Sequence, residues 1–146
     1  MTVRLATLAL FAILVLGCND VRAFEGTWKG PRVGDPAPLH VGVAMTASAT
    51  LAIDAIDTHG LRGALSISGL VDAAPFVSIE GAEADVLSGI SFNGAPIRVY
   101  LAFVTIPDGG GEALAVIALY DERRIEVRVL RGGAQPLYGI FALAAG

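Results

Sequence analysis

Apolar and polar residues alternate along most of the chain after residue 23. Successive side chains of a strand point to opposite faces, so this alternation predicts strands with one buried face each. Turn sequences separate the runs at intervals of about ten residues, a spacing typical of antiparallel sheets. Asn93-Gly94 predicts a two-residue hairpin turn. The runs are 24–29, 39–46, 51–54, 61–68, 84–92, 97–106, 113–120, 125–130 and 137–143, and the other turns are 57–60, 107–111, 121–124 and 132–136.

We therefore expect an all-β fold, an antiparallel meander that closes into an eight- to ten-stranded barrel or a barrel-like sandwich. Closure would hide the two edge strands, whose unpaired backbone groups otherwise invite pairing with other chains. An eight-stranded barrel has an interior that side chains fill or that holds one small ligand. We assign this β-barrel-like domain to residues 24–146 and expect a signal helix at the N-terminus before it.

Residues 97–106 and 113–120 depart from the alternation because they are apolar on both faces. The outer face of a solvated barrel should be polar, so something must cover these strands. The loop at 30–38, a second sheet, a partner chain or the membrane surface are the alternatives. Exposed apolar patches mark interaction sites. The candidate interface therefore consists of Tyr100, Val104, Val116 and Tyr120.

The N-terminus follows a different pattern. Arg4 precedes an apolar run at 5–16, and this run ends at Gly17 and the only cysteine, Cys18. Such a run has the length of the apolar region of a secretory signal peptide. A membrane-spanning helix needs roughly 20 apolar residues. The pattern predicts a signal peptide over residues 1–17.

Val15-Leu16-Gly17-Cys18 resembles the lipobox of bacterial lipoproteins. The resemblance implies cleavage between Gly17 and Cys18, a lipidated tether over 18–23, and fatty acyl chains such as palmitate on Cys18. Two or more chains anchor a protein stably to a membrane. The resemblance also implies a place in the bacterial cell envelope, periplasmic or on the outer face. Alternatively, ordinary signal peptidase cuts after Ala23 and releases a secreted protein.

The charge limits the classes of partner that we expect, and the cysteine content limits the disulfides. Arg4 is the only charged residue of the first 17, so the remaining chain carries nine basic and 14 acidic residues, a formal net charge of −5. This argues against nucleic acid as a partner. With Cys18 bound to lipid, no cysteine is left for a disulfide.

Gly26-Thr27-Trp28 at the start of the first strand resembles the Gly-x-Trp motif of lipocalin-like and avidin-like barrels. The resemblance implies that Trp28 closes one end of the barrel and that a cation from a late strand, Arg128 or Arg131, packs over it. It also implies a lumen able to carry a ligand. The candidate lumen residues are Trp28, Val41, Val43, Ile90 and Phe103.

Side chains suited to catalysis or metal binding are scattered. Asp54, Asp57 and His59 lie close together, but Asp and His are common at turns for local reasons. No serine lies in a nucleophile-elbow motif. We therefore expect no enzyme activity, metal or cofactor. We expect a non-catalytic envelope lipoprotein that acts as a binding or protein-interaction module, either with a partner protein or by self-association; the alternative is a carrier of a small apolar ligand in the barrel lumen.

Overall fold

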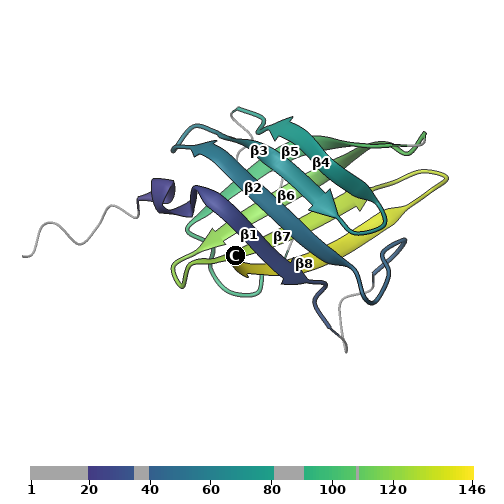
Figure 1. Ribbon diagram of the computed structural model, residues 1–146, viewed down its shortest axis with the longest axis horizontal. Coiled ribbons are helices and arrows are strands. Elements are labelled where there is room, and N and C mark those ends of the chain that lie inside the picture. Colours follow the sequence, from purple (N-terminus) through teal and green to yellow (C-terminus); the bar gives the residue numbers. More distant parts are fainter. Residues whose placement is uncertain (1–19, 35–39, 81–90, 108) are drawn as a thin grey trace, which may run out of the picture.

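The computed structural model describes residues 20–34, 40–80, 91–107 and 109–146. It confirms the all-β antiparallel meander: eight strands form one sheet that curls into a nearly closed barrel (Figure 1). The predicted signal peptide, with Gly17 and Cys18, lies outside the described residues. The strands are β1 (Gly26–Pro31), β2 (Ser48–Ile56), β3 (Leu61–Ile67), β4 (Val71–Val77), β5 (Arg98–Ile106), β6 (Gly111–Tyr120), β7 (Arg124–Arg131) and β8 (Leu137–Ala145).

The order of the strands in the sheet is β4-β3-β2-β1-β8-β7-β6-β5. Neighbours in the sheet are therefore neighbours in the chain, except that β1 pairs with β8, as in Trp28 opposite Ala145. The two outermost strands meet at a single described bridge, between Ser78 and Ala102. One sheet thus wraps around its own interior, and the barrel is favoured over the two-sheet sandwich.

The interior holds one connected cluster of apolar side chains, supplied by all eight strands. In β2, for example, Ala49, Leu51 and Ile53 point inward and are buried, while alternate residues point outward. The largest interior side chains with at most 2% exposure are Trp28, Leu51, Leu61, Leu65, Ile67, Ile117, Leu119, Ile125, Phe141 and Leu143. Side chains of this size fill the narrow interior of an eight-stranded barrel.

A short 3₁₀ helix, η1 (Val21–Phe24), packs against one end of the barrel. The Asp20 side chain accepts a hydrogen bond from the backbone N–H of Arg22 and so caps this helix. Val21 and Phe24 are buried. The Phe24 ring stacks on Trp28 at 5.4 Å, and the Trp28 indole donates a 2.8 Å hydrogen bond to the Phe24 carbonyl. Residues 20–23, expected to belong to a tether, are thus partly folded onto the barrel.

The cation expected over Trp28 is not supplied by Arg128 or Arg131, so that expectation was wrong. Arg128 points to the outer face of β7, where it lies 5.0 Å from the Phe92 ring. Arg131 lies at the far end of β7 and donates to the carbonyls of Gly110 and Gln135. Phe24 takes the position next to Trp28 instead.

The expected strand at 39–46 is not formed by its described part. Gly42 has a φ of 67°, which turns the chain out of the extended conformation. Val41 still forms one bridge, to Tyr138 of β8. The expected strand at 84–92 lies outside the described residues up to position 90, and Ser91 and Phe92 are not in a strand.

Two further differences concern turns and a strand that alternation did not predict. Asn93 and Gly94 form a bend, and no hairpin, in the connection that leads to β5. β4 was not predicted because Ala73, with a φ of 45°, shifts the register against β3 and interrupts the alternation. Pro75 also falls within β4, and proline within a run is a signal against a strand.

Candidate functional site

Three of the four exposed large apolar side chains among the described residues gather at the place where β4 meets β5; the fourth, Met45, lies before β2. Antiparallel pairing of Ser78 with Ala102 sets Val77 opposite Phe103 and Ile79 opposite Leu101. The side chains of Val77 and Phe103 are 68% and 52% exposed, and Ile79 is 41% exposed. It is unusual for large exposed apolar side chains to lie next to one another. Patches formed by such side chains mark interaction sites.

Strand register continues this patch around the barrel. Phe103 pairs with Leu114 of β6, Leu114 with Leu130 of β7, and Leu130 with Tyr138 of β8. All of these side chains lie on the outer face, and the last three are half-buried. We call this row the apolar band; it consists of Val77, Phe103, Leu114, Leu130 and Tyr138.

The neighbouring outer-face row is apolar except for Arg128, and the chain itself buries it. Leu101, Val116, Arg128 and Ile140 face outward, yet each is buried. Arg128 donates a 2.6 Å hydrogen bond from its terminal nitrogen to the Ser91 carbonyl. The segment before β5 therefore lies against the outer face of β7, so at least part of the cover that the double-sided apolar strands require is intramolecular.

An ion pair is buried beneath this segment. Arg128 Nε lies 2.6 Å from Glu126 Oε1, and the two side chains are 9% and 5% exposed. Two groups of this segment contact the Arg128 guanidinium. The Phe92 ring lies 5.0 Å from it, and the Ser91 carbonyl accepts a hydrogen bond from it. Desolvating two charges is costly, so close pairing and hydrogen bonds are needed to hold them there.

A second cation holds the same segment. The Arg124 guanidinium stacks 3.8 Å from the centre of the Tyr120 ring and donates to the Asn93 carbonyl at 3.3 Å. Burial raises the pKa of Tyr120 above its ordinary value of 10.0. Glu126 thus neutralises Arg128, whereas Arg124 contacts an aromatic ring and a carbonyl.

The four candidate interface residues do not form an exposed surface. Tyr100 and Val104 point into the barrel and belong to its core. Val116 and Tyr120 point outward but are 0% and 2% exposed within the single chain. The expectation that these residues are available for docking is corrected accordingly.

The candidate lumen residues divide into four groups. Trp28 and Val43 are part of the buried core cluster. Val41 is half-buried, and Ile90 lies outside the described residues. Phe103 points outward in the apolar band, which corrects its assignment to the lumen. Residues 97–106 are apolar on both faces, so sequence alternation alone could not show which face is inside.

The cluster of Asp54, Asp57 and His59 serves the turn between β2 and β3. Asp57 Oδ1 accepts hydrogen bonds from the backbone N–H groups of His59 and Gly60 at 2.8 and 2.9 Å. These bonds lower the pKa of Asp57 below its ordinary value of 3.8. Asp54 is exposed in β2. No three potential metal ligands come together in the parts of the chain that the structure describes.

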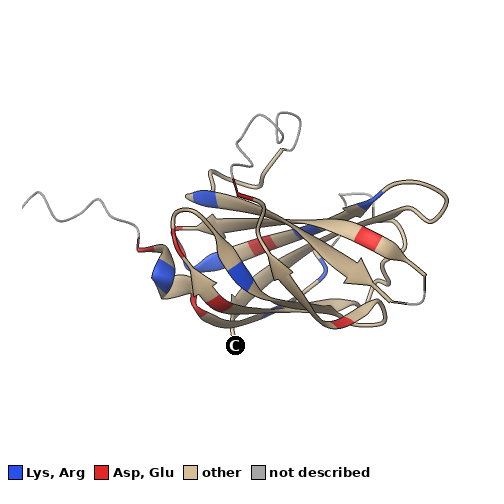
Figure 2. Cartoon of the chain, turned by 90° about the horizontal axis from the view of Figure 1, so that it is seen from above, with Lys and Arg blue, Asp and Glu red and all other residues tan. Residues whose placement is uncertain are grey.

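A groove of about 700 Å³ opens beside this turn, between η1 and the end of β4. Its lining mixes charges of both signs, with Arg22 and Arg62 next to Glu25 and Glu80. Figure 2 shows the same mixture over the barrel, with basic and acidic positions interspersed. Mixed charge at an open groove gives no preference for an anion or a cation.

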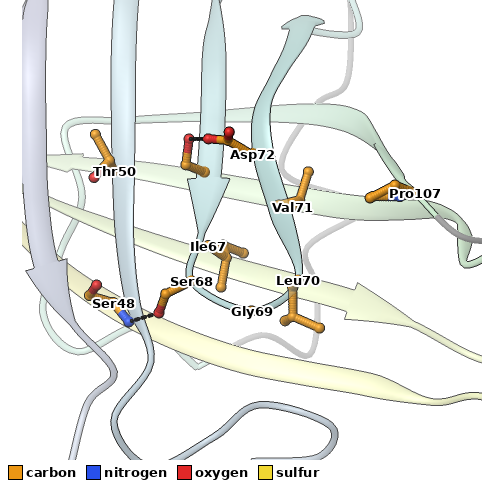
Figure 3. Close-up of a pocket in the computed structure, with 10 residues that line it drawn as sticks. Ser48, Thr50, Ile67, Ser68, Gly69, Leu70, Val71, Asp72 and Pro107 are labelled. Atoms are coloured by element: carbon orange, nitrogen blue, oxygen red, sulfur yellow. Dashed lines mark hydrogen bonds between the residues drawn. The ribbon is translucent and has the colours of Figure 1, made fainter.

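A second groove, of about 510 Å³, lies at the opposite end of the barrel, around the β3–β4 hairpin. Its serines serve the backbone: Ser68 Oγ accepts from the Ser48 N–H, and Ser66 Oγ accepts from the Ala73 N–H, both at 2.9 Å. Figure 3 shows Pro107 on the side of Leu70 and Val71, away from Ser48. The groove is thus polar on one flank and apolar on the other.

Tyr100 allows a test of this geometry by pH. Its hydroxyl donates a 2.6 Å hydrogen bond to the Asp57 carbonyl, and burial raises its pKa above 10.0. Because the folded pKa exceeds the unfolded one, the tyrosine contributes stability below about pH 10 that is lost as the pH rises further. We expect the free energy of unfolding, measured by urea titration, to fall between about pH 8 and about pH 11. In Tyr100→Phe this fall should be smaller, with the rest due to Tyr120; an unchanged fall would contradict the assignment.

Comparison with protein-family models, with curated proteins and with solved structures found no match for this chain. No helix among the described residues is long and apolar enough to cross a membrane.

Proposed function

We propose that this chain is a non-catalytic lipoprotein of the bacterial cell envelope and that its barrel is a binding module for another protein. The observation that carries the proposal is the exposed part of the apolar band, where Val77 and Phe103 stand side by side across the junction of β4 and β5. Burying this apolar surface against a partner would be favourable, at about 25 cal/mol per Å².

The contacts of η1 support lipidation at Cys18 over cleavage after Ala23. Cleavage after Ala23 would remove Val21, which is buried, and Asp20, which caps η1. It would also remove the Ala23 carbonyl that accepts a hydrogen bond from Arg123. A cut between Gly17 and Cys18 leaves all of these contacts in place.

The packing of the interior favours a binding module over a carrier. A carrier of a small apolar ligand needs an unfilled lumen, whereas inward-facing side chains from all eight strands form one connected core here. Trp28 and Phe141, two of the bulky side chains among them, are buried within that core. A ligand would have to displace such side chains, at a cost in packing.

The described candidates for chemistry have structural partners, which supports a non-catalytic role. Asp57 caps a turn, and Ser66, Ser68 and Ser78 each accept a backbone N–H. Ser66 Oγ also donates a long hydrogen bond of 3.5 Å to Asp72 Oδ1, and by accepting the Ala73 N–H it holds the β3–β4 hairpin.

The anchor is tested by fractionation. We expect the Cys18→Ser protein to move from the membrane fraction to the soluble fraction, because without the thiol no acyl chain can be attached. The matched control is Ser48→Ala, which removes a hydroxyl from the barrel and should leave the protein in the membrane. Retention of the Cys18→Ser protein in washed membranes would contradict lipidation.

The binding surface is tested by photo-crosslinking in intact cells. A photoreactive phenylalanine analogue at position 103 should give discrete adducts with another protein, and Val77→Glu should abolish them by placing a charge in the contact. The same analogue at Ala134, an exposed position in the β7–β8 turn, is the control. Identical adducts at both positions, or none at 103, would contradict a binding role for the apolar band.

A further inference from the structure

The barrel is incompletely sealed between β4 and β5. Along the described chain these strands share the bridge between Ser78 and Ala102, next to a 2.7 Å hydrogen bond from the Ile79 N–H to the Leu101 carbonyl. The neighbouring junction of β5 with β6 is paired over the whole length of β5, from Arg98 to Ile106. We call the junction of β4 with β5 the seam; from Val77 back to Val71, toward the end of the barrel where β5 stops, no further bridge is described.

The two strand edges of the seam differ in their capacity to form the backbone hydrogen bonds of a sheet. On the β4 side, Ala73 forms a bulge and Pro75 has no N–H to donate. Bulges and prolines are the usual devices that stop an edge strand from pairing. The β5 side is regular up to Ile106. Since the Leu101 carbonyl faces β4, the alternation of an antiparallel strand directs the backbone groups of Phe103 and Thr105 to the same edge.

Core residues beside the seam keep a slight exposure. Val71, Ala74 and Ile106 are core residues that each retain 7% exposure, whereas the core residues of β7 retain none. The groove of about 510 Å³ reaches this place, lined on its apolar flank by Leu70, Val71 and Pro107 (Figure 3). The opening therefore combines the part of the β5 edge beyond Phe103, for which no bridge to β4 is described, with apolar side chains.

At the open end of the seam the flanking charges are acidic, whereas exposed Arg62 of β3 pairs with Val77 at the closed end. Asp72 on β4 is exposed, and Glu112 of β6, which pairs with Thr105, is exposed on the other side. Arg131 lies at the end of β7, and its side chain donates to the carbonyls of Gly110 and Gln135. An occupant with basic residues on its outer side would complement these carboxylates.

We propose that the seam accepts an extended peptide strand of the partner protein, antiparallel to β5, with apolar side chains facing the barrel and basic side chains facing out. This inference rests on the proposed binding function and names the form of the partner. A strand added to a sheet edge gains main-chain hydrogen bonds, while alternate side chains supply selectivity. β4 and β5 run in opposite directions, so the added strand is antiparallel to only one of them, and β5 offers the unblocked edge.

The inference is tested with a synthetic peptide of alternating valine and lysine, labelled with a fluorophore and titrated with the purified full chain. We expect binding, weaker by about tenfold or more when valine alternates with glutamate. Two N-methylated valine–lysine peptides, one methylated on the valines and one on the lysines, keep the side chains but lose backbone donors. At least one should bind about tenfold less tightly, since a lost ladder hydrogen bond costs about 1 kcal/mol or more.

Two variants locate the site on β5. Thr105→Pro removes an N–H from the seam edge, where proline is tolerated, and Thr105→Val is the matched control that keeps it. We expect Thr105→Pro to weaken peptide binding about tenfold and Thr105→Val to leave it unchanged. Circular dichroism checks that both variants fold; if Thr105→Pro does not, the N-methylated peptides decide.

Equal binding of the parent and both N-methylated peptides would overturn the inference, as would equal binding by Thr105→Pro and Thr105→Val in folded proteins. The absence of binding by the valine–lysine peptide would overturn it as well. Any of these results together with crosslinks at position 103 would leave the proposed function standing and reject only strand addition. Loss of the crosslinks at position 103 together with backbone-dependent peptide binding would reject the apolar band as the binding surface and leave strand addition standing.

Discussion

Replacing Arg128 with alanine should lower the free energy of unfolding by about 3–5 kcal/mol. The substitution leaves the Glu126 carboxylate buried without the guanidinium 2.6 Å away, and it leaves the Ser91 carbonyl without its donor. Few single substitutions cost as much, and the cost is comparable to the lower end of the total stability of a domain. The measurement is a urea titration followed by circular dichroism.

The control for this prediction removes both charges. In the double variant Glu126→Gln, Arg128→Met no ion is left unpaired, so most of the lost stability should return. Arg123→Ala, at an exposed cation three residues past the end of β6, should change the stability by less than about 1 kcal/mol. A loss below about 1 kcal/mol in Arg128→Ala would show that the pair is solvated and that Ser91 does not lie over it.

Replacing Trp28 with alanine should cost a similar amount, about 3–5 kcal/mol. The indole is 2% exposed, stacks on Phe24 and donates to the Phe24 carbonyl. Its removal opens a cavity at the end of the barrel and takes away the contact that holds η1. Trp28 is the only tryptophan, so circular dichroism must replace fluorescence as the readout.

Phe103→Ala provides the comparison for Trp28→Ala. Both changes delete an aromatic ring, but Phe103 is half-exposed on the outer face. Truncation of an exposed side chain usually changes stability by no more than about 0.5 kcal/mol. A loss of stability in Trp28→Ala as small as the loss in Phe103→Ala would mean that the ring of Trp28 is not inside the barrel.

Alternation predicted the strands whose two faces differ in polarity. In β2, Leu51 and Ile53 are separated by small or polar residues, and both the strand and its buried face followed from this pattern. β5 is the opposite case. Neighbouring residues such as Leu101 and Ala102 are both apolar, so the pattern does not show which of them faces the interior. The structure places Tyr100 and Val104 inside, where the Tyr100 hydroxyl reaches the Asp57 carbonyl, a partner 43 residues away.

The site depends on contacts that no local pattern contains. The outer face of β7 is covered because Arg128 and Arg124 bind carbonyls of Ser91 and Asn93, more than thirty positions earlier in the chain. Backbone carbonyls are present at every residue, so the sequence gives no sign of which one an arginine will reach. The apolar band is likewise a product of register, which sets Val77 opposite Phe103 only once the sheet has curled.

The position of η1 bears on how the barrel is oriented on a membrane. If Cys18 carries acyl chains, as we propose, only Asn19 separates it from Asp20, the cap of η1. An extended chain from Cys18 to Asp20 spans at most about 7 Å. The η1 end of the barrel would then rest near the lipid headgroups, with little freedom to tumble. The opposite end, where the seam opens at Val71 and Ile106, would face away from the bilayer, within reach of proteins in the aqueous compartment.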